Sequence, residues 1–114
     1  MVDIHRGDVV LCDLCEKAGT DPSGLRQALI VQSDKANTAS PFTVIIPFTI
    51  NIPYAALPSH VLIQTEQTGL TQDSVLLCEQ IRVLDKKRIV KVSGHLSNYS
   101  IEQVNRALAT VLGL

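Results

Sequence analysis

Short apolar runs separated by turn residues make up most of this chain. Two of these runs, within residues 8–14 and 27–33, are apolar at consecutive positions, which predicts central strands covered on both faces. Further strands are predicted, in chain order, at residues 42–50, 60–64, 74–84 and 88–92, with a turn at 85–87. The pattern therefore predicts a mainly β structure.

The third of these runs contains Pro47, which has no N–H to donate to a neighbouring strand. An edge, a bulge or a bend is therefore expected there, with Thr49 just beyond it. Residues 74–84 (SVLLCEQIRVL) are predicted as one longer strand. Four side chains would share one face of that strand: Leu76, Cys78, Gln80 and Arg82.

A change of period marks the end of the chain. Between residues 98 and 112 the apolar side chains recur at helical spacing, with Ser97 as the N-cap and Gly113 just after the last apolar position. This predicts an amphipathic C-terminal helix docked on the sheet. Six or so short strands followed by one helix indicate a small antiparallel β-barrel, and the length indicates a single domain over residues 1–114.

Composition adds two expectations, one about partners and one about location. Hydrophobic residues make up 46% of the chain and charged residues only 18%, so part of the apolar surface is expected to cover a partner. No apolar run approaches the roughly 20 residues of a membrane helix. The first residues carry charges where a signal peptide is apolar, and the three cysteines are an odd number. We therefore expect a cytoplasmic protein with no membrane contact.

The formal net charge of −1 gives no overall signature of nucleic-acid binding. The charges are nevertheless unevenly placed, because ten consecutive residues contain a basic group with Asp85 as their one acid. The basic group comprises Arg82, Lys86, Lys87, Arg88 and Lys91. It is either a local patch that holds phosphates or a solvated hairpin, and the sequence leaves both open.

Arg26 is the first candidate for chemistry. It follows Gly24, opens an apolar strand and has no charged neighbour downstream until Asp34. A guanidinium held in this way suits a phosphate group, although a surface arginine beside a strand fits the same pattern. Thr49 is less distinctive, since threonine is common in strands.

Histidine and cysteine side chains offer alternative chemistry. His5, His60 and His95 supply imidazoles for acid–base catalysis, but their spacing brings no two together. Cys12 and Cys15 form a C-x-x-C pair placed in a strand, and a zinc site would need further ligands where only Cys78 remains. We interpret the pair as structural or incidental, and expect no metal and no cofactor.

Taken in order, several segments resemble the MazF/PemK family of toxin endoribonucleases from about residue 5 to residue 114. The segments are RGDVVLCDL at 6–14, GTDPSGLRQALIVQSD at 19–34, VIIPFT at 44–49, DSVLLCEQIRVLDKKRI at 73–89 and the C-terminal HLSNYSIEQVNRALATVLGL. No single segment is very specific, but their order and spacing are.

The resemblance implies an SH3-like barrel that is homodimeric, cuts single-stranded mRNA selectively without metal, and is silenced by a cognate antitoxin. It implies that Arg26 and Thr49 are the catalytic pair. Asp21, in the loop before Arg26, and Gln80 have weaker claims to catalysis or substrate contact. In the loop after Thr49, Tyr54 is an aromatic side chain that can stack on an RNA base, or an ordinary solvated tyrosine.

Two departures from the family keep other functions open. Gln27 replaces the usual proline after the arginine, and Ile50 replaces a frequent serine after the threonine. One alternative is a CcdB-like toxin, which shares the barrel but binds DNA gyrase and catalyses nothing. The other is a degenerate member that only sequesters an antitoxin.

Overall fold

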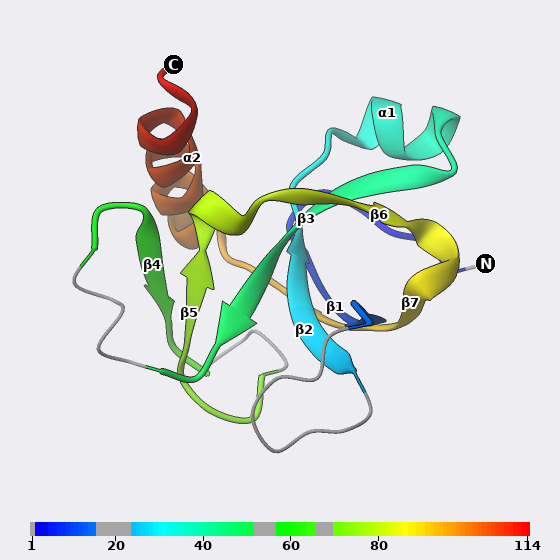
Figure 1. The fold of residues 1–114 in the computed structure, drawn as a ribbon, viewed down its shortest axis with the longest axis horizontal. Helices are drawn as coiled ribbons and strands as arrows, with labels where there is room; N and C mark the ends of the chain where they lie inside the picture. Colours follow the sequence, from blue (N-terminus) through cyan, green and yellow to red (C-terminus); the bar gives the residue numbers. More distant parts are fainter. Residues whose placement is uncertain (1, 16–23, 52–56, 66–69) are drawn as a thin grey trace.

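A computed structural model of the protein describes residues 2–15, 24–51, 57–65 and 70–114. These residues form a seven-stranded antiparallel sheet, shown in Figure 1. The strands are β1 (Asp8–Asp13), β2 (Leu25–Ile30), β3 (Phe42–Thr49), β4 (His60–Ile63), β5 (Ser74–Leu77), β6 (Arg82–Asp85) and β7 (Ile89–His95). The helices are α1 (Asp34–Ala39), α2 (Asn98–Leu112) and the 3-10 turns η2 (Cys78–Gln80) and η3 (Lys86–Arg88).

The sheet bends into an incomplete barrel. Its strand order is β4-β5-β3-β2-β1-β7, and β6 pairs with β3 beside β5. Among the described strands no ladder joins β6 to β7, so the barrel is not closed. The predicted mainly β fold with a C-terminal helix is confirmed, in this barrel-like form.

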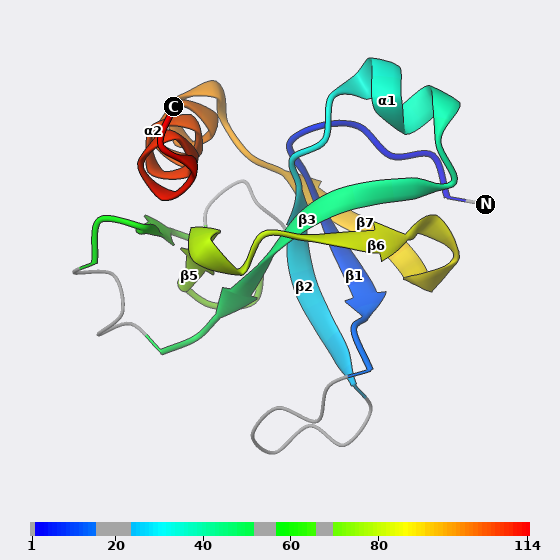
Figure 2. The same cartoon turned by 45° about the horizontal axis from the view of Figure 1, so that its top comes forward.

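The central strands are covered on both faces, as their sequence predicts. In β1, Val9 and Val10 point to opposite faces and both are fully buried. Val9 belongs to a core that also contains Val104 of α2, whereas Val10 belongs to a second core inside the barrel. Figure 2 shows α2 lying beside β5, apart from β1 and β2. The barrel interior is therefore free of the helix, and its open end can hold a site.

The C-terminal helix begins and ends at the predicted residues. The Ser97 side chain accepts a hydrogen bond from the Ser100 backbone N–H, and Gly113 takes a left-handed conformation at φ +71°. Its buried face contains Val104, Ala107 and Leu108. No helix in the described part of the chain is long and apolar enough to cross a membrane.

The predicted single strand at 74–84 is wrong, because the 3-10 turn η2 divides it into β5 and β6. Both parts pair with β3: Leu76 lies opposite Phe48, and Arg82 lies opposite Ile45. The intervening residues 77–81 therefore have only residues 46–47 of β3 facing them, so they must bulge. Pro47, which has no N–H to donate to a neighbouring strand, lies in this stretch, and the irregularity expected around it is confirmed.

Helix α1 was also not predicted. Ser33, assigned to the end of a strand, is its N-cap and accepts from the Ala36 N–H. Asn37 is buried and accepts hydrogen bonds from Thr43 and Gln32 side chains. The segment is too short for apolar periodicity, and its cap was the one available signal.

Candidate active site

Arg26 lies in β2, near the open end of the barrel. Gly24, at φ +78°, turns the chain into this strand, and Arg26 pairs with Cys12 of β1. Alternation along β2 sets Arg26 on the same face as Ala28, which belongs to the interior core. Its Nη2 donates a 2.6 Å hydrogen bond to the Phe48 carbonyl. The guanidinium is thus held against the C-terminal end of β3.

Thr49 directly follows Phe48, the residue whose carbonyl Arg26 grips. Strands β2 and β3 pair through Ala28 and Pro47, and continuing this register places Arg26 opposite Thr49. Thr49 is half-buried, and its Oγ1 accepts a 3.3 Å hydrogen bond from the Asn51 N–H. The structure therefore brings the two sequence-predicted residues to neighbouring positions on one face of the sheet.

A second arginine lies close to this pair. Burial raises the pKa of the Cys12 thiol to about 11, although the positive charges of Arg82 and then Arg26 act to lower it. Both guanidinium groups are therefore within electrostatic range of the same thiol. Arg82 pairs with Ile45 of β3, whose side chain faces the barrel interior. From the sequence, Arg82 belonged only to a local basic group, because its place at the site depends on the register of β6.

The two cysteines of the C-x-x-C pair do not form one site. Cys12 is buried and donates its S–H to the Arg26 carbonyl, while Cys15 is exposed beyond the end of β1 and contacts Arg88. The cysteines in the described residues are free, and those residues contain no cluster of His, Cys, Asp or Glu suited to a metal ion. With its raised pKa, Cys12 stays a thiol at neutral pH and is a poor nucleophile.

The remaining sequence-predicted residues are less closely tied to the pair. Gln80 is exposed at the end of η2, ahead of Arg82, and no described contact links it to Arg26 or Thr49. Asp21 and Tyr54 lie outside the described residues.

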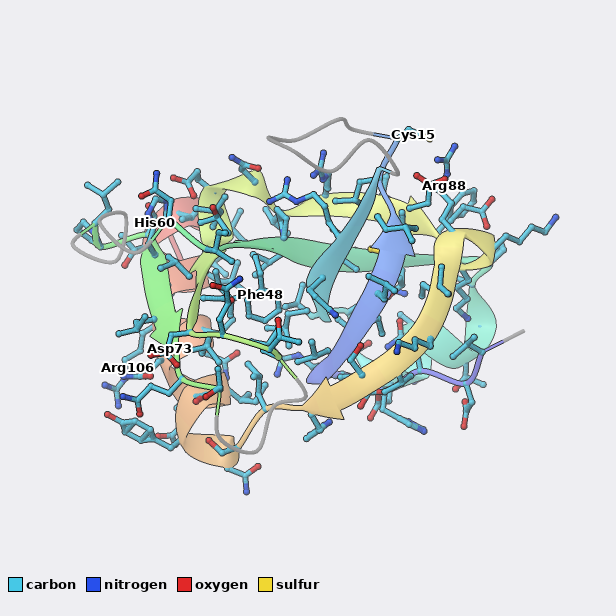
Figure 3. All side chains as sticks on the ribbon, turned by 90° about the horizontal axis from the view of Figure 1, so that it is seen from below. Cys15, Phe48, His60, Asp73, Arg88 and Arg106 are labelled. Atoms are coloured by element: carbon cyan, nitrogen blue, oxygen red, sulfur yellow. The ribbon has the colours of Figure 1, made fainter. Side chains whose placement is uncertain are left out.

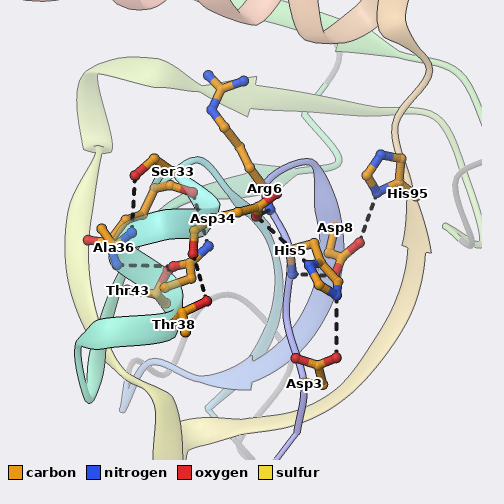
Figure 4. A network of polar contacts seen from close by, with 12 residues as sticks. Asp3, His5, Arg6, Asp8, Ser33, Asp34, Ala36, Thr38, Thr43 and His95 are labelled. Atoms are coloured by element: carbon orange, nitrogen blue, oxygen red, sulfur yellow. Dashed lines mark hydrogen bonds and ion pairs between the residues drawn. The ribbon is translucent and has the colours of Figure 1, made fainter.

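Each histidine has a carboxylate partner. His60 Nε2 lies 2.6 Å from Glu79, and its side chain is only 4% exposed. His95 Nδ1 lies 2.8 Å from Asp8, which also accepts from the backbone N–H of His5 (Figure 4). The His5 imidazole itself lies 3.3 Å from Asp3, so His5 and His95 share Asp8 only through the His5 backbone, and their two rings have different carboxylate partners. Asp8 begins β1, however, whereas Arg26 faces its far end, so this cluster fastens the N-terminal segment.

Comparison with known proteins agrees with this geometry. The model of the PemK-like, MazF-like toxins of type II toxin–antitoxin systems matches residues 5–112. Endoribonuclease MazF of Staphylococcus saprophyticus is 40% identical over 111 residues, which are 97% of this chain and 92% of the relative.

Solved structures give the same result. A mycobacterial endoribonuclease solved in complex with its cognate antitoxin has a TM-score of 0.80 and 26% identity, over 98% of this chain and 97% of that one. MazF from Deinococcus radiodurans has a TM-score of 0.77 over 97% of both chains, and at 21% identity it supports the fold alone. The resemblance stated from the sequence is thereby confirmed, and the chain belongs to the PemK-like, MazF-like family of toxins of type II toxin–antitoxin systems.

Proposed function

We propose that this protein is a single-domain toxin endoribonuclease that cuts single-stranded mRNA, with Arg26 and Thr49 as its catalytic pair. Family membership and the 40% identical endoribonuclease support the activity. One observation carries the site. The Arg26 guanidinium is fixed on the Phe48 carbonyl immediately before Thr49, at an open end of the barrel.

The proposed reaction is attack by the RNA's own 2′-hydroxyl on the adjacent phosphorus. The 2′ oxygen loses its proton and bonds to phosphorus, the bond from phosphorus to the 5′ oxygen breaks, and that oxygen takes up a proton. The products are a 2′,3′-cyclic phosphate and a free 5′-hydroxyl. The enzyme must align the attack and stabilise charge on the phosphoryl oxygens.

The two residues divide this work. Arg26 is permanently charged and has N–H groups beyond the one it gives to Phe48, so it can bind a phosphoryl oxygen. The Thr49 hydroxyl accepts from Asn51 and can donate its own hydrogen to a second oxygen. Together they supply the charge stabilisation that a metal ion gives in other nucleases, so we propose a reaction without metal. Asp21 remains a proposed base, and Gln80 and Tyr54 remain proposed substrate contacts.

The test is cleavage of a long unstructured RNA by purified protein in excess EDTA, with the product ends mapped. We expect cyclic phosphate ends from the wild type and from Arg106→Ala, which removes an exposed arginine of α2. Arg26→Ala and Thr49→Ala should give no cleavage while keeping a cooperative unfolding transition. Full activity in either variant would contradict the assignment. An inactive wild type that binds gyrase would favour the CcdB-like alternative, and an inactive wild type that binds only an antitoxin would favour a degenerate member.

We further propose that the protein acts in the cytoplasm as a homodimer that a cognate antitoxin silences. The mycobacterial neighbour, an endoribonuclease, was solved with its antitoxin, and this chain carries large exposed apolar side chains for which a partner is expected. In the strands these are Phe42, Leu62, Val83, Val90 and Val92, and outside them Ile50, Leu57, Tyr99, Leu112 and Leu114. Sedimentation of the purified chain, alone and with antitoxin, tests both associations.

A further inference from the structure

A cavity of about 230 Å³ opens beside the proposed active site. One wall is the end of β1 and the residues after it, and the other is β6 with Arg88, the last residue of η3. The lining residues are Asp13, Leu14, Cys15, Arg82, Val83, Leu84, Asp85 and Arg88. Nothing in the proposed catalytic step uses this cavity. Two of its lining side chains are arginines, and together with Arg26 they bring three guanidinium groups to this end of the barrel.

Arg82 connects the cavity to the catalytic pair. Asp13, which lines the cavity, directly follows Cys12, and Cys12 pairs with Arg26 across β1 and β2. The positive charges of Arg82 and Arg26 both act on the Cys12 thiol, so both guanidinium groups lie within electrostatic range of it. A phosphate bound between Arg82 and Arg88 would therefore neighbour a phosphate held by Arg26. This succession is what the backbone of a single-stranded RNA requires, because every nucleotide carries one negative charge.

Arg88 forms the outer rim of the cavity. Its Nη1 donates to the Cys15 Sγ, which bridges η3 to the end of β1, and Figure 3 shows the two side chains adjacent at one edge of the molecule. A thiol is a weak acceptor, whereas a phosphate oxygen forms a charge-assisted, two-pronged bond with a guanidinium. The contact with Cys15 therefore holds the guanidinium in place without offering it the partner it binds best.

Two carboxylates also face the cavity, and each is engaged with a backbone turn. Asp13 accepts a 2.8 Å bond from the Cys15 N–H, and Asp85 accepts a 2.9 Å bond from the Lys87 N–H. Their charges offset those of Arg82 and Arg88, so the cavity is not a strong trap for free anions. Binding there is expected to depend on a phosphate that is already tethered to the catalytic site by the RNA chain.

The other basic residues of η3 belong to a different surface. Lys86 Nζ donates to the Asn37 carbonyl, and Lys86 and Lys87 line a separate cavity with Val2 and Ile89. Four of the basic residues that the sequence groups together are thus divided between two cavities: Lys86 and Lys87 line one, and Arg82 and Arg88 line the other. This division makes a charge-matched control possible within three consecutive residues.

We propose that the cavity lined by Arg82 and Arg88 is a second phosphate subsite, which binds an RNA phosphate next to the scissile one. The inference rests on the proposed ribonuclease function. The volume of the cavity is below the roughly 300 Å³ of the smallest ordinary ligand pockets. A cavity of this size suits a phosphate with part of its ribose rather than a whole nucleotide. The subsite selects for backbone, not for base, and fixes the direction in which the strand leaves the catalytic pair.

The test measures binding of a non-cleavable oligonucleotide that has a 2′-O-methyl group at the cleavage position. In a series of such probes, one phosphate at a time is replaced by an uncharged methylphosphonate. For the wild type we expect one flanking replacement to weaken binding by about tenfold, the scale of one hydrogen-bonded ion pair. Arg88→Gln should bind the unmodified probe about tenfold more weakly than the wild type does. The methylphosphonate at the sensitive phosphate should then weaken binding by this variant no further. The variant's dependence of log affinity on log salt should be shallower by about 0.7 for the single-stranded probe.

Lys87→Gln and Arg106→Gln are the controls, because each removes one positive charge elsewhere, next to Arg88 or on α2. Both should keep the tenfold loss at the same phosphate. Arg82→Lys, which keeps the charge but not the guanidinium fork, tests the wall formed by β6. It should weaken binding of the same phosphate while the unfolding temperature of the protein stays unchanged.

Three results would overturn the subsite. If the losses of affinity caused by Arg88→Gln and by the methylphosphonate are additive, Arg88 does not contact that phosphate. A loss of similar size in Lys87→Gln would show diffuse attraction in place of a site. A wild type that neither binds nor cuts RNA would refute the proposed function as well, whereas cleavage with additive losses refutes the subsite alone.

Discussion

Replacing Thr49 with valine isolates one hydroxyl at the proposed active site. Valine has nearly the shape of threonine and the same preference for strands, so β3 should keep its pairing with β5 through Val75. Thr49 is half-buried, and its one described hydrogen bond, from the Asn51 N–H, is long at 3.3 Å. Losing that bond should lower the free energy of unfolding by about 0.5–1 kcal/mol.

The expected effect on catalysis is much larger. Removing one preorganised donor from a site of developing negative charge typically lowers kcat by about 10²–10³-fold, or roughly 3–4 kcal/mol in the activation barrier. The two effects differ enough to be separated by experiment. Because the hydroxyl is needed chiefly in the transition state, KM should change little while kcat falls.

The assay combines kcat and KM on an unstructured RNA in EDTA with urea unfolding of the same preparations. Thr49→Ser should recover most of the activity, because it restores a hydroxyl at the same position. Thr110→Val serves as the control, since it removes a hydroxyl that bonds only the Arg106 carbonyl on α2. The reasoning is refuted if Thr49→Val keeps kcat within about threefold of the wild type, or if serine is as inactive as valine.

Three further predictions concern the labelling of the thiols, the pH dependence of stability and the entry to β1. In the native protein at pH 8, iodoacetamide should modify exposed Cys15 and spare Cys12, because burial raises the pKa of the Cys12 thiol to about 11. Mass spectrometry of the product measures the labelling of each cysteine. Rapid labelling of Cys12 would contradict its buried position. Because the unfolded thiol ionises near 9.0, this group's contribution to stability is complete below that pH and is lost as the pH rises toward about 11. Gly7→Ala should lower the free energy of unfolding by about 1–3 kcal/mol, since Gly7 has a φ of +95° and an added Cβ would lie 2.8 Å from the His95 ring. Gly113→Ala is the control at φ +71° with nothing within 4 Å, and equal losses in a thermal melt would mean that the His95 contact adds nothing.

Features set by local sequence were predictable from the chain. Helix α2 needs only its apolar spacing, a serine before it and a glycine after it, and it was predicted with the observed boundaries. The apolar runs of β1 and β2 likewise required cover on both faces, which two separate cores provide. Arg26 was singled out by the glycine before it, but its proximity to Thr49 depends on strand register, which only the family resemblance suggested.

Features set by pairing between distant segments were not predictable. The run at 74–84 alternates as a strand should, yet η2 divides it. The division is fastened by contacts across the sheet, since the Cys78 N–H donates to the Ser59 carbonyl and Glu79 binds His60. Neither contact leaves a local signal in residues 74–84. Arg82 was missed at the site for the same reason.

The break at Pro47 links the fold to the site. Along one edge, β3 pairs first with β6 and then with β5. If this pairing were continuous, residues 74–84 would form a single unbroken strand. Because residues 46–47 face five residues of the opposite segment, β5 can extend to Thr49 while β6 turns Arg82 toward the barrel interior. The change of partner thus brings Arg82 within electrostatic range of Cys12, while the register of β2 on the other edge of β3 sets Thr49 beside Arg26. Pro47 belongs to both arrangements, because it pairs with Ala28 of β2 and, having no N–H to donate, lies where β3 changes partner from β6 to β5.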